Sequence, residues 1–82
     1  MDFKAAAREV LGDAGHPLHY TDITEIAFES GYLESAGHTP QDTMRARLSV
    51  DVRDNPDTPF VQTAPGVYYL KGTFEPPGDA VY

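Results

Sequence analysis

Apolar residues recur at helical spacing near the start of the chain. They follow the i, i+3, i+4, i+7 pattern that puts side chains on one face of an amphipathic helix. These positions are Phe3, Ala6, Ala7, Val10, Leu11 and Ala14. Asp2 can cap the first turn, and Gly15 followed by Pro17 is typical of a helix end. The pattern predicts a helix from about Asp2 to Ala14.

The next segment predicts a short strand and a second helix. Residues 18–20 form a short extended segment, which we expect to add one small strand. Thr21 is a good N-cap for a helix from Asp22 to about Ser30, which Gly31 ends. The positions expected to face the core are Ile23, Ile26 and Ala27, with Leu33 packing back on the core afterwards.

A third helix begins with a strong start signal. Thr39 is its predicted N-cap, Pro40 its first residue, and Asp42 can reach back to the cap amide. Asn55-Pro56 stops it. Its buried stripe is Met44, Leu48 and Val52. The opposite face carries Gln41, Asp42, Arg45, Ala46, Ser49 and Arg53, with Arg47 on the flank.

Two strand-like runs follow, at residues 60–63 and 67–70. Pro65-Gly66 between them indicates a hairpin, with a three-residue loop from Ala64 and Gly66 in the left-handed conformation. Three helices bury their stripes only by packing around one core, and the hairpin would cover its open side. The expected fold is therefore α+β and mainly α: a winged helix-turn-helix over residues 1–71, followed by a flexible tail over residues 72–82.

Composition and length exclude several classes of protein and of site. The chain has 82 residues and no cysteine, which suits one domain and excludes disulfides and thiolate metal sites. No apolar run approaches the ~18 residues of a membrane span. The first residues have neither the basic segment nor the apolar segment of a signal peptide, so we expect a cytoplasmic location.

The charge is acidic but unevenly spread. Thirteen acidic and six basic residues give a net charge of −7, which is unfavourable for non-specific binding to nucleic acid. Residues 1–39 carry −5 and residues 54–82 carry −3, whereas residues 40–53 carry +1. The one segment that is not acidic is therefore the predicted third helix.

A resemblance to a known family rests on residues spread over positions 6–70. The chain is similar to the HARE-HTH winged-helix domain, found in the RNA polymerase delta subunit, in ASXL-type chromatin proteins and beside restriction endonucleases. The matching residues are Ala7, Val10-Leu11, Gly15-His16-Pro17-Leu18-His19, Ile23, Ile26, Thr39-Pro40, Leu48, Asp51-Val52, Phe60 and the segment from Gly66 to Leu70. The family usually has an aromatic residue where this chain has Ser49. The resemblance implies a non-catalytic module of transcription or of DNA modification and restriction.

Duplex DNA, bound weakly, is the first predicted partner. A winged helix lays its third helix in the major groove, where Gln41 and Arg45 would reach base edges or phosphates. Arg47 and Arg53 would contact the backbone. Gly66 and Lys71 mark the wing. The alternative is a solvated helix face, with Arg47 and Asp51 as an i, i+4 pair, and a plain hairpin turn.

A protein of the transcription or restriction machinery is the alternative partner. The predicted second helix presents acidic side chains that could bind a basic patch or mimic nucleic acid. These residues are Asp22, Glu25, Glu29 and Glu34. Solubility or adaptation to high salt explains the same residues without a partner.

We expect no catalytic site, no cofactor and no metal. Serine, histidine and acidic residues form no recognisable catalytic set, and Gly-rich phosphate loops are absent. His16 and His19 are three apart but not on a helix, and His38 lies elsewhere, so three converging ligands are not indicated. His19 is expected to pin a loop by a hydrogen bond.

Overall fold

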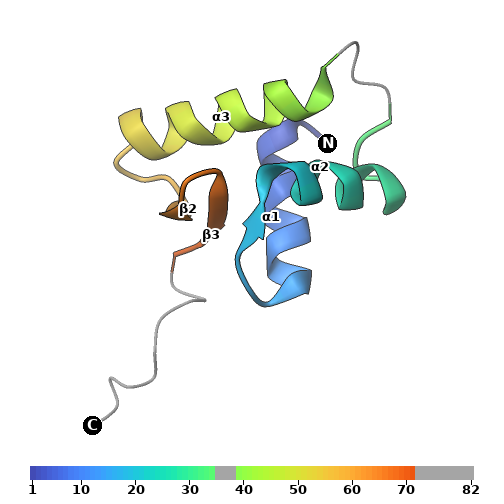
Figure 1. Ribbon diagram of the computed structural model, residues 1–82, viewed down its shortest axis with the longest axis horizontal. Helices are drawn as coiled ribbons and strands as arrows, with labels where there is room; N and C mark the ends of the chain where they lie inside the picture. The colour runs from blue at the N-terminus through green and yellow to red at the C-terminus, as the bar shows by residue number, and fades with distance from the viewer. Residues whose placement is uncertain (35–38, 72–82) are drawn as a thin grey trace, which may run out of the picture.

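The computed structural model describes residues 1–34 and 39–71. Its elements are α1 (Phe3–Ala14), β1 (Leu18–His19), α2 (Tyr20–Glu29), α3 (Pro40–Asp54), β2 (Phe60–Ala64) and β3 (Val67–Leu70). This order confirms the predicted α+β, mainly helical, winged-helix fold (Figure 1). The predicted flexible tail and His38 lie outside the described residues.

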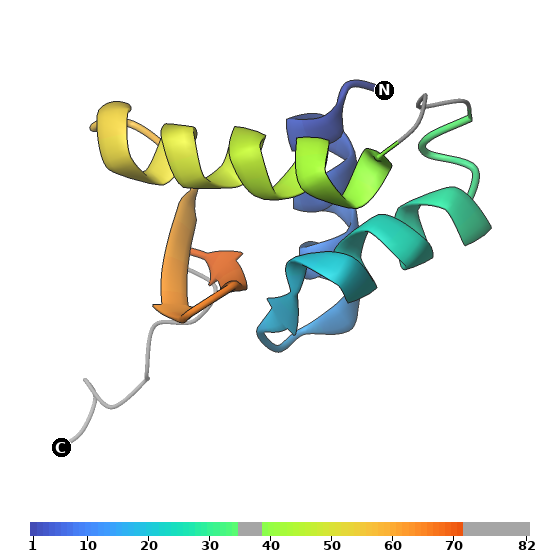
Figure 2. The same ribbon diagram turned by 45° about the horizontal axis from the view of Figure 1, so that its top comes forward.

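The helices and the hairpin enclose one core. Figure 2 shows α3 extending over the hairpin at its C-terminal end and over α1 and α2 at its N-terminal end. The core contains the apolar stripes of all three helices together with residues of the hairpin. Its members are Ala6, Ala7, Val10, Leu11, Ile23, Ala27, Leu33, Met44, Leu48, Phe60, Tyr68, Tyr69 and Leu70. The hairpin therefore closes the open side of the helices, as the sequence predicts.

The sheet is antiparallel, with the order β1-β3-β2. Leu18 pairs with Tyr68, and Phe60 pairs with Leu70. The predicted three-residue loop is wrong, because β2 continues through Ala64 and only Pro65-Gly66 form the turn. The irregularity that accommodates the turn lies inside β2, where the register shifts between Gln62 and Ala64. Gly66 has the expected left-handed conformation, with φ +75°.

The start of α2 differs from the prediction. The N-cap is His19, not Thr21: the His19 ring accepts a hydrogen bond from the Thr21 amide. The Tyr20 amide, which starts the helix, donates to the Gly66 carbonyl of the wing turn at 2.9 Å. A donor satisfied by the sheet lets the helix begin two residues early. Thr24 is also buried, and its hydroxyl donates to the Tyr20 carbonyl at 2.8 Å.

The start of α3 agrees with the prediction in its residues. Thr39 is the N-cap and Pro40 the first helical residue, but the Thr39 side chain makes no capping hydrogen bond. The buried stripe contains Met44 and Leu48 as predicted, whereas Val52 is only half-buried. Asp51 is buried in its place. This carboxylate on the inner face is the largest departure from the predicted α3.

Candidate functional site

The outward side of α3 is an exposed helical surface that carries three arginines. Arg45, Arg47 and Arg53 are all exposed, as is Gln41. Arg45 and Arg47 are two residues apart, a rotation of about 200° around the helix axis. The two guanidinium groups therefore lie on opposite flanks of α3, and its outward ridge lies between them.

Arg45 extends toward the start of α2. Its guanidinium carbon lies 6.0 Å from the centroid of the Tyr20 ring, within cation–π distance. The other neighbour of the Tyr20 ring is His19, whose ring is stacked on it with 4.4 Å between centroids and 29° between planes. The guanidinium of the third helix is thus supported by an aromatic pair that the sequence did not indicate.

The wing turn meets the same aromatic pair. A Cβ built on Gly66 would lie 2.9 Å from Nε2 of His19 and 3.4 Å from Cε2 of Tyr20. His19 is also held by Thr21, whose Oγ1 lies 2.8 Å from its Nδ1. The predicted hydrogen bond of His19 is therefore present, but it caps the first turn of α2 and does not pin a loop. Tyr20 therefore brings together Arg45 and Gly66, two predicted site residues from different elements.

The remaining predicted site residues are not part of this cluster. Arg47 is on the α1 flank, beside Lys4. Lys71 is exposed at the far end of β3, about 16 Å of extended chain from Gly66. Arg53 donates to both oxygens of Asp54, at 3.0 and 3.2 Å. This pair raises the pKa of Arg53 and lowers that of Asp54, and the carboxylate offsets the Arg53 charge.

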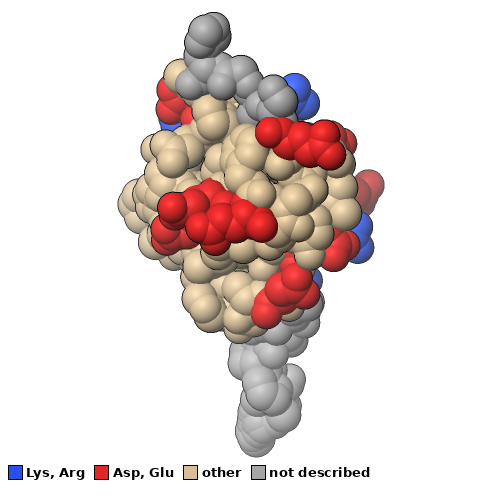
Figure 3. Space-filling view, turned by 90° about the vertical axis from the view of Figure 1, so that its right-hand side faces the viewer, with Lys and Arg blue, Asp and Glu red and all other residues tan. Residues whose placement is uncertain are grey.

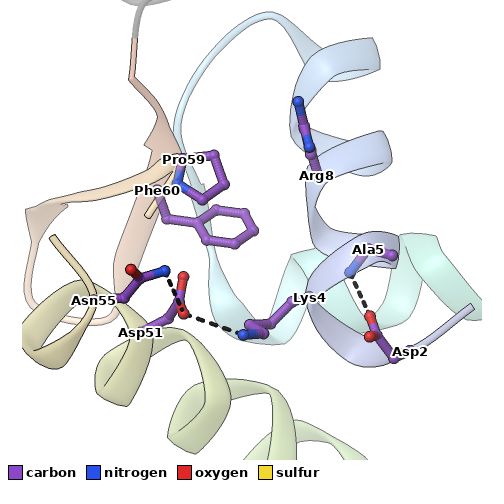
Figure 4. A pocket seen from close by; sticks show the side chains of 8 residues that line it. All are labelled: Asp2, Lys4, Ala5, Arg8, Asp51, Asn55, Pro59 and Phe60. Atoms are coloured by element: carbon purple, nitrogen blue, oxygen red, sulfur yellow. Dashed lines mark hydrogen bonds and ion pairs between the residues drawn. The ribbon is translucent and has the colours of Figure 1, made fainter. Parts of the chain in front are cut away.

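The alternative interpretation of the sequence paired Asp51 with Arg47. In the structure, the hydrogen bonds of Asp51 instead hold the fold together. Lys4 of α1 and Asn55 donate to one oxygen of Asp51, at 3.1 and 3.3 Å (Figure 4). The Thr58 hydroxyl donates to the other oxygen, and the Phe60 amide donates to Thr58. The network joins α1, α3 and β2 beside a cleft of about 210 Å³ that Arg8 also lines.

The network also controls the protonation of Asp51. The Thr58 hydrogen bond is the main cause that holds the pKa of Asp51 below its usual range, with Lys4 and Asn55 adding to it. Desolvation opposes this effect but is outweighed. One feature of the sequence does indicate that Asp51 faces the core: it is seven positions after Met44 and so lies on the same face of the helix.

Ser49 is likewise not a free outward side chain. It is half-buried, and its hydroxyl is hydrogen bonded to the hydroxyl of Tyr68 at 2.8 Å. The position where the resemblance led us to expect an aromatic ring thus holds a polar contact between α3 and the central strand of the sheet. Ser49 connects the third helix to the wing.

The acidic residues of α2 form a separate surface. Asp22, Glu25 and Glu29 are exposed and lie within an arc of about 60° on the helix; Glu34 is exposed beyond its end. Figure 3 shows the side on which α2 lies in Figure 1: acidic side chains gather there, and basic ones lie only at the edge of the view. This face and the arginines of α3 are distinct surfaces.

Other kinds of site are not indicated in the described part of the chain. Within residues 1–34 and 39–71, no three His, Cys, Asp or Glu side chains converge as metal ligands would. None of the helices in these ranges is long and apolar enough to cross a membrane.

Comparison with known proteins gives one match. The family model HARE-HTH, described as the helix-turn-helix domain of ASXL proteins and restriction endonucleases, matches residues 1–73. Neither a curated protein nor a solved structure matches the chain significantly.

Proposed function

The chain belongs to the HARE-HTH family of helix-turn-helix, DNA-binding domains, and we propose that it is a non-catalytic winged-helix module that binds duplex DNA weakly through α3 and the wing turn. The module would act in transcription or in DNA modification and restriction. The observation that carries the proposal is the meeting of Arg45 and Gly66 at Tyr20. It joins the third helix to the wing, the two elements that winged-helix proteins place on DNA.

The arrangement assigns different roles to the arginines. Arg45 is near the N-terminal half of α3, the part of a recognition helix that enters the major groove, and Gln41 is one turn before it. Arg47, on the other flank, would contact the DNA backbone. Arg53, already paired with Asp54, would contribute less.

Binding is expected to be weak and strongly dependent on salt. The net charge of −7 repels phosphate, and the interface supplies only three or four cations. That many phosphate contacts correspond to a slope of about −3 in log affinity against log salt. A second copy or a partner domain would therefore strengthen the complex considerably.

The first test is a titration of nitrogen-15-labelled protein with a short mixed-sequence duplex at low salt. We expect amide shifts within residues 41–53 and 65–71, reversed by added salt. Absence of shifts at millimolar duplex would contradict the proposal. Shifts confined to residues 22–34 would contradict it as well, because the acidic face would then be the interface.

Matched charge reversals make the test quantitative. Arg45→Glu and Arg8→Glu change the net charge equally, but Arg8 is on α1, at the cleft beside Asp51. We expect Arg45→Glu to weaken binding about tenfold at low salt, and Arg45→Glu with Arg47→Glu to abolish it, whereas Arg8→Glu has a small effect. Equal losses from Arg45→Glu and Arg8→Glu would mean that only net charge matters.

A second candidate function is docking on a protein of the transcription or restriction machinery. It is favoured by the acidic arc of α2, where Asp22, Glu25 and Glu29 share one exposed face. Purified RNA polymerase is a direct probe. Binding that is abolished by Glu25→Lys with Glu29→Lys, and unaffected by Arg45→Glu, would support this function. Indifference to the α2 variant would count against it.

A further inference from the structure

Val50 is an apolar side chain that the fold does not use. It is 46% exposed, and in the described ranges the only other exposed large apolar residue is Met1, at the chain terminus. Valine is also a poor helix former, because its branched side chain is restricted against the preceding turn. Neither packing nor helix propensity explains a valine at this position on α3.

The surroundings of Val50 define a small apolar patch. Ala46 is exposed one turn before it, and a shallow hollow beside Val50 is lined also by Ala46, Arg47, Lys4 and Asp51. Arg47 and Arg53 are three residues before and after Val50, so both are its neighbours on the helix surface. The patch of Ala46 and Val50 is therefore bordered by Arg47 on one side and by the Arg53–Asp54 ion pair on the other.

The middle of the outer face offers little hydrogen bonding to a base. Ser49 is the polar residue next to the patch, and its hydroxyl is bonded to Tyr68. The groups available for hydrogen bonds, Gln41 and Arg45, lie toward the start of the helix. We therefore expect reading of base edges by hydrogen bonds to come mainly from the first turns of α3, whereas the exposed Ala46 and Val50 in the following turn suit an apolar group.

The major groove exposes one apolar group, the C5 methyl of a pyrimidine, which thymine carries in ordinary DNA. We propose that Ala46 and Val50 form a subsite for this methyl group, so that the module prefers thymine opposite the middle of α3. This inference rests on the proposed DNA-binding function. A phosphate contact from Arg47, with a smaller contribution from the paired Arg53, would hold the patch in the groove.

Uracil provides the direct test, because it differs from thymine only by the missing C5 methyl. Affinities would be measured at one low salt concentration for duplexes of identical sequence that contain thymine or uracil. We expect the thymine duplex to bind three- to fivefold more tightly, about the effect of burying one methyl group. A third duplex, with 5-methylcytosine in place of cytosine, distinguishes the two sources of the methyl.

Variants assign the preference to the patch. Val50→Ala removes most of the apolar surface and improves helix propensity, so it should fold and bind but lose the preference for thymine. Val50→Thr keeps one methyl at nearly the same volume and should retain part of the preference. Tighter binding of the 5-methylcytosine duplex, also lost in Val50→Ala, would extend the subsite to that base.

The outcomes separate this inference from the proposed function. If thymine and uracil duplexes bind equally and with the same salt dependence, the methyl subsite is wrong and the DNA-binding function stands. A thymine preference that persists unchanged in Val50→Ala overturns the subsite too. If no duplex binds, both proposals fail.

Discussion

Two sides of α3 each carry a charged side chain in contrasting surroundings: Asp51 on the inner face, and Arg45 on the flank toward α2. Asp51 is 7% exposed and is fixed by hydrogen bonds from α1, from Asn55 just after α3 and from the segment before β2. Arg45 is exposed and is supported only by the face of the Tyr20 ring. The charge of Asp51 is neutralised by hydrogen bonds within the fold, whereas the exposed charge of Arg45 is accessible to a ligand.

Because Asp51 is buried and Arg45 is exposed, we expect the first residue to affect the stability of the fold and the second to affect binding. A buried carboxylate loses hydration and is stable only while every donor stays in place, so its removal leaves donors unpaired. An exposed cation contributes little to folding, and its charge is available to phosphate. Changes on the Asp51 side should therefore alter unfolding, whereas changes on the Arg45 side should alter affinity.

Removal of the Asp51 side chain is the largest expected effect. Asp51→Ala should lower the free energy of unfolding by about 2–4 kcal/mol, because Thr58 and Asn55 lose their acceptor and a cavity opens beside Phe60. Urea unfolding measures the loss. Asp54→Ala is the matched control, since Asp54 is exposed on the same helix, and it should change stability by less than about 0.5 kcal/mol. Equal losses would mean that Asp51 is not a special position.

Acid should produce a smaller loss on the same side, because a protonated Asp51 stays in place. The folded protein holds the pKa of Asp51 below its unfolded value, so the stabilisation is complete above the unfolded pKa of about 3.9 and is lost as the pH falls through the folded pKa. Urea unfolding at pH 7, 5, 4 and 3 measures this. Asp51→Asn should show a shallower decline below pH 4. Parallel declines would place the acid sensitivity in other carboxylates.

The wing turn tests the Arg45 side through Gly66. Gly66→Ala should cost about 1–2 kcal/mol, because φ is +75° and the new Cβ would lie 2.9 Å from the His19 ring. Gly31→Ala separates the two causes, since Gly31 has φ +83° and no atom within 4 Å of a built Cβ. It should lose less than Gly66→Ala in thermal or urea unfolding. An equal loss would show that the His19 contact is readily relieved.

The sequence predicted the fold well because the apolar spacing of the helices and the turn residues are local signals. Met44 and Leu48, Gly66, the end of α1 at Ala14 and the end of α2 at Glu29, shortly before Gly31, follow from such signals. The errors occur where a distant group intervenes. The Gly66 carbonyl, 46 residues away, starts α2 at Tyr20 instead of Asp22.

The sequence predicted which charged residues the candidate site contains, but not how they are arranged. The distribution of charge along the chain singled out the arginines of the third helix, and the structure leaves all three exposed. Helical spacing also indicates that Arg45 and Arg47 lie on different flanks. The role of Tyr20 was not predictable, because it depends on how α2, α3 and the wing turn pack together.

The smallest predicted effect tests whether Tyr20 serves Arg45. Tyr20→Leu removes the ring face and should weaken DNA binding about threefold, the value of an exposed cation–π contact. Tyr20→Phe keeps the ring and should bind as the unmodified protein does. Fluorescence anisotropy with a labelled duplex at one salt concentration resolves such a difference.

A double-mutant cycle shows whether the effect passes through the guanidinium. In the Arg45→Ala background, Tyr20→Leu should cost nothing further, because the group that the ring orients is already gone. A threefold loss that persists in that background would mean that Tyr20 acts on DNA or on the wing by itself. Arg45 would then be an ordinary exposed cation, and the contrast between the two sides of α3 would rest on burial alone.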